Sequence, residues 1–219
     1  MKMSRARAVR EWAAKAVDKY YLGFVLLSEK ISRSYEDYKP FFYAHGLEML
    51  CKAYIIGDRH SQYKDLSFRA AKAKIDKIAK DFGHNLRKCI EELSRRTAFP
   101  SGFMNKVHYH SSINEVDLTN LDMLNTLQDV YLEARYPVVE LNYQRYYREK
   151  VRNNPKAINK RYPEILMYSH ELERFSIKLF RIILPRIEKD FRLKLPRDKF
   201  CSDIRDEDWE RFSNLFFNN

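Results

Sequence analysis

Glycine and proline are scarce in this sequence of 219 residues, which contains 5 of the first and 7 of the second. Both residues interrupt regular secondary structure, and a fold of many short strands joined by tight turns needs more of them. The shortage therefore favours long helices with few connections.

Cysteine is also rare, with Cys51, Cys89 and Cys201 and no Cys-x-x-Cys pair. An odd number without paired spacing argues against a disulfide framework or a zinc site built on thiolates. Two of the three lie on apolar faces of expected helices, so we expect buried free thiols in a reducing compartment.

Long hydrophobic runs are missing as well. No apolar stretch approaches the roughly 20 residues that span a bilayer. The N-terminus reads MKMSRARAVREW, which is charged and has no apolar signal core. We therefore expect a cytoplasmic protein that does not enter a membrane.

Positive charge, by contrast, is in excess. Lysine and arginine number 41 against 30 acidic residues, which gives a formal net charge of +11. Such a balance favours a polyanionic partner, namely nucleic acid, a nucleotide or an acidic protein. A merely solvated basic surface explains the same composition, so charge alone leaves both interpretations open.

Apolar residues recur every three or four positions through most of the chain, which is the spacing of amphipathic helices. The helix from Pro40 to Gly57, where Leu47, Cys51 and Tyr54 form one stripe, is expected to organise the rest. Gly57 is predicted to stop this helix and Pro185 to kink or end a later one. The other expected helices cover residues 5–33, 68–82, 85–97, 119–135 and 163–185, with a short amphipathic piece around Trp209.

No alternation long enough for a reliable strand occurs, and residues 99–117 are interpreted as a loop with a short extended or helical piece. The predicted fold is all-α, an up-and-down bundle of four to five long helices. We expect one bundle domain over residues 1–193, with a basic, tyrosine-rich segment at 138–162. Residues 194–219 are expected to form a helical tail packed on the bundle or extending from it.

Three short motifs occur in order on the expected helices: Leu50-Cys51-Lys52-Ala53, Gly83-His84-Asn85-Leu86 and Arg135-Tyr136-Pro137. In this order they resemble the HEPN domain, the higher eukaryote and prokaryote nucleotide-binding helical family. Many HEPN proteins are metal-independent ribonucleases, often toxins paired with a nucleotidyltransferase-like antitoxin, and two chains form their catalytic cleft. The resemblance therefore implies a helical bundle, a homodimer and such a partner.

The catalytic signature of that family is an arginine followed by a histidine after four to six residues, and this chain lacks it. Its nearest pair, Arg161 and His170, has eight residues between. What matches is the Arg-Tyr-Pro branch, for which the resemblance implies binding of RNA or a nucleotide rather than cleavage.

Two candidate binding residues lie in these motifs. His84 at a helix start can contact phosphate or transfer a proton, or it can simply satisfy the helix end. Arg135 can bind a phosphate while Tyr136 stacks on a base, or it can be a cation that favours the end of a helix.

The segment from Tyr143 to Tyr162 alternates cations with tyrosines, a composition suited to phosphates and stacked bases. Its alternative interpretation is a solvated helix face with inward-packed tyrosines. The candidate binding residues here are Arg145, Tyr146, Tyr147, Arg148, Arg152 and Arg161.

No metal or other cofactor is expected. His108 and His110 flank Tyr109, but a metal site needs more ligands at fixed spacing. Three functions remain open: a non-catalytic module that binds RNA or a nucleotide, an endoribonuclease with a diverged site using Arg135 with His84 or His170, and a structural partner of an acidic protein.

Overall fold

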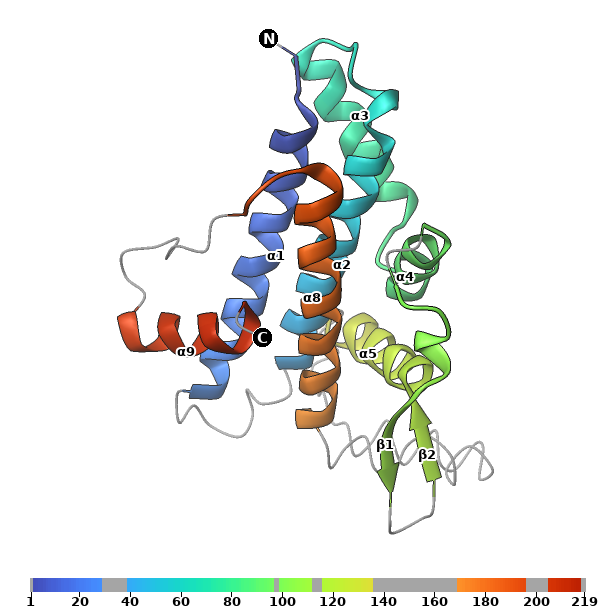
Figure 1. The fold of residues 1–219 in the computed structure, drawn as a ribbon, viewed down its shortest axis with the longest axis vertical. Coiled ribbons are helices and arrows are strands. Elements are labelled where there is room, and N and C mark those ends of the chain that lie inside the picture. The colour runs from blue at the N-terminus through green and yellow to red at the C-terminus, as the bar shows by residue number, and fades with distance from the viewer. Residues whose placement is uncertain are drawn as a thin grey trace.

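The computed structural model describes residues 2–28, 39–96, 99–111, 116–135, 169–195 and 205–217. These parts of the chain are mostly helical, which confirms the all-α prediction (Figure 1). The helices are α1 (Arg5–Ser28), α2 (Lys39–Asp58), α3 (Phe68–Asp81), α4 (Leu86–Arg95), α5 (Asn120–Arg135), α8 (Ser169–Phe191) and α9 (Asp206–Phe216). Two single 3-10 turns, η2 (Arg59–Gln62) and η3 (Phe103–Asn105), and two short strands complete the described parts.

Helix α2 lies at the centre of the fold. It packs against α1 along most of its length, and also contacts α8, α5, α4 and α3 (Figure 1). Residues 43–57 are buried except for the half-buried His45 and Met49, so the helix is enclosed on nearly all sides. Leu47, Cys51 and Tyr54 belong to this core, as the apolar stripe predicts.

Glycines allow α1 and α2 to approach closely. A Cβ atom on Gly46 would come within 2.6 Å of the Tyr20 ring, and one on Gly23 within 3.1 Å of the Tyr43 ring. Glycine inside a helix costs roughly 1 kcal/mol relative to alanine. The space that these two residues leave for neighbouring tyrosine rings explains why the cost is tolerated.

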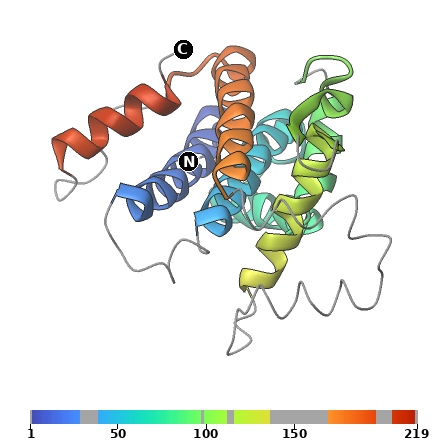
Figure 2. The same cartoon turned by 90° about the horizontal axis from the view of Figure 1, so that it is seen from below.

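Helix α9 covers α1 and α8 on the side of the molecule away from α5 (Figure 2). Its aromatic residues meet those of the bundle edge on: Phe212 lies 5.4 Å from Tyr21 and Phe216 lies 5.2 Å from Phe180, centroid to centroid. Such pairs add to the area that they bury. The C-terminal amphipathic piece is therefore a helix packed on the bundle.

Polar side chains cap the first turns of α4 and α5. Asn85 accepts a 2.8 Å hydrogen bond from the Lys88 amide at the start of α4. The Asp122 side chain accepts from the Thr119 backbone amide at 3.0 Å and the Thr119 side chain accepts from the Asp122 amide at 3.2 Å, which forms a reciprocal capping box at the start of α5. Gly83, at φ +54°, ends α3 in the left-handed conformation that glycine adopts readily.

Helix α2 ends at Asp58, one residue after the predicted stop, but Gly57 is not the cause, and Pro185 does not end α8. Gly57 does not stop α2 through a left-handed turn; it is helical and buried, and a Cβ there would come within 2.6 Å of Val9 and 2.7 Å of the Phe191 ring. Pro185 lies inside α8, which continues to Phe191. The buried residues Ile183, Leu184 and Ile187 on both sides of this proline hold the helix in the core, which outweighs the missing hydrogen bond.

Two short strands and the turn η3 lie in the region interpreted as a loop with a short extended or helical piece. Strand β1 (Val107–Ser111) pairs antiparallel with β2 (Val116–Thr119), and an irregularity in register falls between Val107 and Tyr109. Five residues against four are too few to give a recognisable alternation in the sequence. The hairpin leads directly into α5 and lies at its start (Figure 1).

Candidate functional site: a buried carboxylate behind His84

A charged pair lies inside the apolar helix α2. Glu48 is fully buried and the side chain of Lys52 is 5% exposed, and the lysine ammonium donates a hydrogen bond to the Glu48 carboxylate. The two residues are four positions apart, a spacing that allows side chains to pair along a helix. Two further groups reach the same carboxylate, so Glu48, Lys52, His84 and Tyr131 are called the Glu48 cluster below.

Tyr131 reaches the carboxylate from α5. Its hydroxyl donates to Oε2 of Glu48, and burial together with the neighbouring negative charge raises the pKa of Tyr131 far above its usual value. The tyrosine therefore stays protonated and remains a donor. With Lys52 it compensates the desolvated carboxylate, which would otherwise be costly to bury.

His84 completes the cluster from the turn between α3 and α4. Its Nδ1 lies 3.1 Å from Oε2 of Glu48 and 3.1 Å from the Tyr131 oxygen. Both neighbours are assigned as acceptors, because Glu48 receives hydrogen bonds from Lys52 and Tyr131 and the Tyr131 proton points to Glu48. We therefore assign the proton of neutral His84 to Nδ1.

The second ring nitrogen of His84, Nε2, belongs to a partly exposed side chain. The side chain is 38% exposed, and no described residue hydrogen-bonds Nε2. An imidazole held at Nδ1 by a carboxylate presents Nε2 as an acceptor when neutral and as an N–H donor when protonated. This geometry suits a contact with a phosphate or a hydroxyl group.

Side chains from α2 and α5 clamp the backbone of the Gly83-His84-Asn85-Leu86 turn. Lys52 donates to the Gly83 carbonyl at 2.6 Å. Gln128 of α5 donates to the His84 carbonyl at 3.0 Å and accepts from the Leu86 amide. These bonds fix the orientation of the turn, so His84 is presented from a rigid backbone rather than from a loose loop.

Aromatic rings extend the surface beside His84. Tyr131 lies between two imidazoles: the His84 ring is 5.9 Å away and edge-on, and the His45 ring is 6.0 Å away and nearly parallel. Phe41, at the start of α2, lies 5.6 Å from Tyr131 and 6.0 Å from His45. Both Phe41 and His45 are half-buried, so part of their ring surface can be reached from outside.

The structure brings one of the predicted site residues, His84, into a defined arrangement. Arg135 is the last residue of α5, one turn beyond Tyr131, but its side chain and Tyr136 lie outside the described residues. His170 belongs to α8, and its side chain is likewise not described. The candidates of the basic segment also lie outside them: Arg145, Tyr146, Tyr147, Arg148, Arg152 and Arg161.

Sequence reasoning missed the role of Glu48, Lys52, His45 and Gln128. One signal was present: Glu48 and Lys52 are the charged residues of an otherwise apolar stretch, LEMLCKAYII. A helix that is apolar on all sides is buried, so a charged pair within it must find partners in the core. The contacts of His45 and Gln128 depend on the position of α5, which no local pattern reveals.

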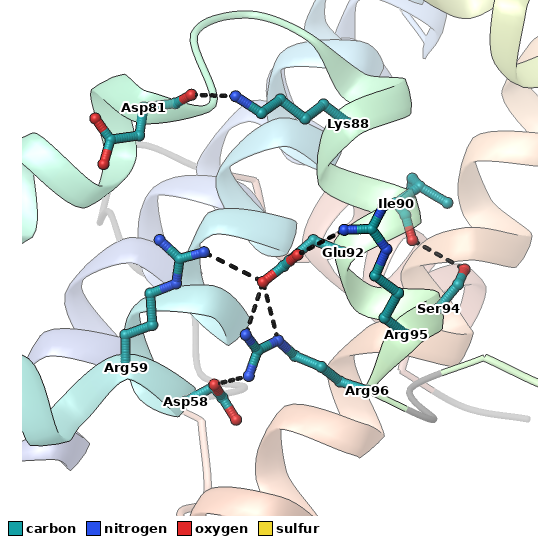
Figure 3. Close-up of polar contacts among 9 residues, drawn as sticks. All are labelled: Asp58, Arg59, Asp81, Lys88, Ile90, Glu92, Ser94, Arg95 and Arg96. Atoms are coloured by element: carbon teal, nitrogen blue, oxygen red, sulfur yellow. Dashed lines mark hydrogen bonds and ion pairs between the residues drawn. The ribbon is translucent and has the colours of Figure 1, made fainter.

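A second charged cluster joins the end of α2 to α4. The Glu92 carboxylate lies among three guanidinium groups, from Arg59 at 3.2 Å, Arg96 at 2.7 Å and Arg95 at 3.8 Å (Figure 3). Hydrogen bonds from Arg96 and Arg59 lower the pKa of Glu92. The arginines of this region are therefore paired with a carboxylate of the chain itself.

A cavity of about 380 Å³ adjoins this cluster. Its lining contains three basic and three acidic side chains together with Phe82, which is 5% exposed. The lining residues are Arg59, Asp81, Phe82, Lys88, Glu91, Glu92 and Arg95. Opposite charges balance and little aromatic surface is open, so the cavity offers less to an anion than the surface at His84.

The His108 side chain on β1 is 7% exposed, and its Nε2 lies 3.6 Å from Oε2 of Glu171. Neither ring nitrogen has a hydrogen bond to a described residue. Burial and the nearby Lys178 lower the pKa of His108. Among the residues that the structure describes, no group of three or more histidine, cysteine or acidic side chains could hold a metal ion.

Cys51 and Cys89 are free and buried, as their apolar positions predict. Burial raises the pKa of Cys89 to about 12, so this thiol is not a nucleophile at neutral pH. Within the described ranges, no helix is both long enough and apolar enough to cross a membrane.

Comparison of this chain with protein-family models, with curated proteins and with solved structures finds no match.

Proposed function

We propose that this protein is a HEPN-like helical bundle that binds RNA or a nucleotide at the surface formed by His84, His45 and Phe41. The observation that carries the proposal is the Glu48 cluster. It holds the Nδ1 side of His84, whose side chain is 38% exposed, and leaves Nε2 without a hydrogen bond to a described residue. Phosphate oxygens and ribose hydroxyls are the groups that such a nitrogen contacts.

The residues of the HEPN resemblance support the proposal by their positions. Lys52 of the first motif bonds Gly83 of the second. The third motif begins at Arg135, one helical turn after Tyr131, which bonds Glu48. The first two motifs thus meet at one polar cluster, and the helix that leads to the third motif contributes Tyr131 to it.

The chemistry of the surface suits a nucleotide. The formal net charge of +11 attracts polyanions over the whole molecule. The rings of His45 and Phe41 offer faces on which a base can stack, an interaction that contributes about 1–3 kcal/mol per base.

The test is fluorescence anisotropy of a labelled single-stranded RNA with His84→Ala and His84→Gln. We expect both variants to bind at least tenfold more weakly than wild type, with an unchanged circular dichroism spectrum. His60→Ala is the matched control, because His60 is another half-buried histidine and lies on η2, away from the cluster. Equal affinity of wild type and both His84 variants would refute the proposed site.

Cleavage of RNA is a second candidate function, and the same geometry favours it. A neutral imidazole with its proton on Nδ1, backed by a carboxylate, is the arrangement of a general base. In RNA such a base would remove the proton of a 2′-hydroxyl as its oxygen attacks the adjacent phosphorus, and the 5′-oxygen would leave with a proton from an acid. Wild-type protein that cleaves RNA in the presence of EDTA, with the activity lost in His84→Ala, would establish this function; intact RNA would leave binding alone.

A further inference from the structure

Helix α3 carries an unusual concentration of cations. Its 14 residues include five lysines and arginines against two aspartates. Four of the five cations are exposed and Lys74 is half-buried. The cations are Arg69, Lys72, Lys74, Lys77 and Lys80, and the acids are Asp76 and Asp81.

Several cations elsewhere in the described parts of the chain are paired with carboxylates. Arg87 pairs with Glu91 at 2.9 Å, Arg186 with Asp190 at 2.8 Å, and the arginines of the second cluster surround Glu92 (Figure 3). None of the five α3 cations forms an ion pair with a described acidic residue. Their charge is therefore directed to solvent rather than neutralised within the protein.

Arg69, Lys77 and Lys80 lie on the outer face of α3, and Lys72 and Lys74 lie at its two edges. The opposite face of α3 buries Ala71, Ile75, Ile78 and Ala79 against the fold. At about 100° per residue, Arg69, Lys77 and Lys80 project within roughly 80° of one another. The helix is about 21 Å long at 1.5 Å per residue and lies at one end of the molecule (Figure 1). Its outer face therefore carries a net positive charge along its length, although Asp76 also projects from it.

The composition of this face favours a nucleic-acid backbone over a protein or a membrane. Protein interfaces rely on buried aromatic or aliphatic anchors, and membrane-binding helices insert large apolar side chains. The apolar residues that α3 exposes are only alanines, Ala70 and Ala73. Cations without apolar anchors suit a ligand bound by its charge alone, which is how phosphates are bound.

We propose that the outer face of α3 is a docking surface for the sugar-phosphate backbone of RNA, separate from the surface at His84. The choice of RNA rests on the proposed function. The α3 face carries no ring and no amide group that reads a base, so its binding is independent of sequence. It adds electrostatic affinity to whatever the surface at His84 recognises.

The experiment measures the affinity of a labelled oligouridine at several salt concentrations for wild type, for Lys72→Gln/Lys77→Gln/Lys80→Gln and for the corresponding glutamate variant. Each phosphate contact with a single strand contributes about 0.7 to the slope of log affinity against log salt. Loss of three contacts should therefore reduce the slope by about two. The affinity at low salt should fall at least tenfold.

The matched control is Arg10→Gln/Lys189→Gln/Lys194→Gln, which removes the same charge at exposed positions on α1, on α8 and just after α8. We expect the control to lower affinity less than threefold. Circular dichroism verifies that every variant is folded, and the neutral glutamine set keeps the test valid if charge reversal disturbs α3.

The outcomes separate this inference from the proposed function. If the α3 variants bind weakly and their slope of log affinity against log salt is reduced, the inference is supported, independently of the affinity of His84→Ala. Unchanged binding by the α3 variants, while His84→Ala binds weakly, overturns the inference alone. Absence of RNA binding by wild type overturns both proposals. If the α3 variants keep their affinity for RNA but lose binding to phosphatidylserine vesicles, the ligand is a membrane and the inference is wrong.

Discussion

Replacing Glu48 by glutamine removes the charge on which the Glu48 cluster depends while keeping the shape of the side chain. The carboxylate is fully buried, and Lys52 beside it is 5% exposed. Glutamine leaves the ammonium with the Gly83 carbonyl and an amide oxygen as its neighbours. Removing one partner of a buried pair costs about 3–5 kcal/mol, because the remaining charge is uncompensated.

That loss is large relative to the whole protein, since domains are stable by about 5–15 kcal/mol. Urea denaturation followed by far-ultraviolet circular dichroism measures it. We expect a lower midpoint with an unchanged dependence on urea, which indicates a change in stability rather than in the surface exposed on unfolding.

The matched control is Glu91→Gln on α4. Glu91 and Arg87 also form a pair four residues apart, with a 2.9 Å contact, but their side chains are 51% and 56% exposed. Exposed pairs contribute about 0–1 kcal/mol, so the same substitution should have little effect. The two variants thus differ mainly in burial.

Removing both charges of the buried pair gives a second check. Glu48→Leu with Lys52→Met leaves no uncompensated charge, and apolar replacements of buried pairs are often tolerated. We expect a smaller loss than for Glu48→Gln alone. A Glu48→Gln variant that loses less than about 1 kcal/mol, or a double variant that is less stable than the single one, would refute the reasoning.

Three further predictions concern other parts of the fold. Leu47→Ala, at a fully buried position in α2, should lower the free energy of unfolding by about 2–5 kcal/mol, measured by urea denaturation. The arginine neighbours lower the pKa of Glu92, so its contribution to stability is present above the unfolded-state pKa and is lost as the pH falls through the folded-state pKa. Glu92→Gln should therefore weaken the loss of stability in acid. The same dependence of unfolding free energy on pH in wild type and variant would contradict this. Burial lowers the pKa of His108, so the unfolded state binds a proton at higher pH than the folded state, and stability should fall as the pH drops below about 6.5. The melting temperature of His108→Leu should depend less on pH than that of wild type. An identical pH dependence would count against this prediction.

The positions of the helices could be predicted from local sequence because their signals are local. Apolar stripes mark the faces that become buried, and Asn85, Thr119 and Asp122 cap α4 and α5 as their spacing indicates. Gly83 ends α3 because the turn that follows requires a positive φ. Each of these features depends on residues within about one helical turn.

Features that depend on distant contacts could not be predicted in the same way. Gly57 has the residue type of a helix stop, but Val9 and Phe191 pack where its side chain would lie. Pro185 remains inside α8 because the core holds the turns on both sides. The motif that contains His84 is local and visible in the sequence. Its partners Glu48 and Tyr131 lie on α2 and α5, 36 and 47 residues away, so the contacts between them are not.

The central claim is that RNA or a nucleotide contacts His84 on the side opposite to Glu48. Nuclear magnetic resonance of protein labelled at its 6 histidines tests it most directly, with the His84 signal assigned from the His84→Gln variant and single-stranded oligouridine as the ligand. We predict that the ring signals of His84 and His45 shift and saturate together, while those of His60 and His108 stay in place. A titration that moves other histidines and leaves His84 unchanged would contradict the claim.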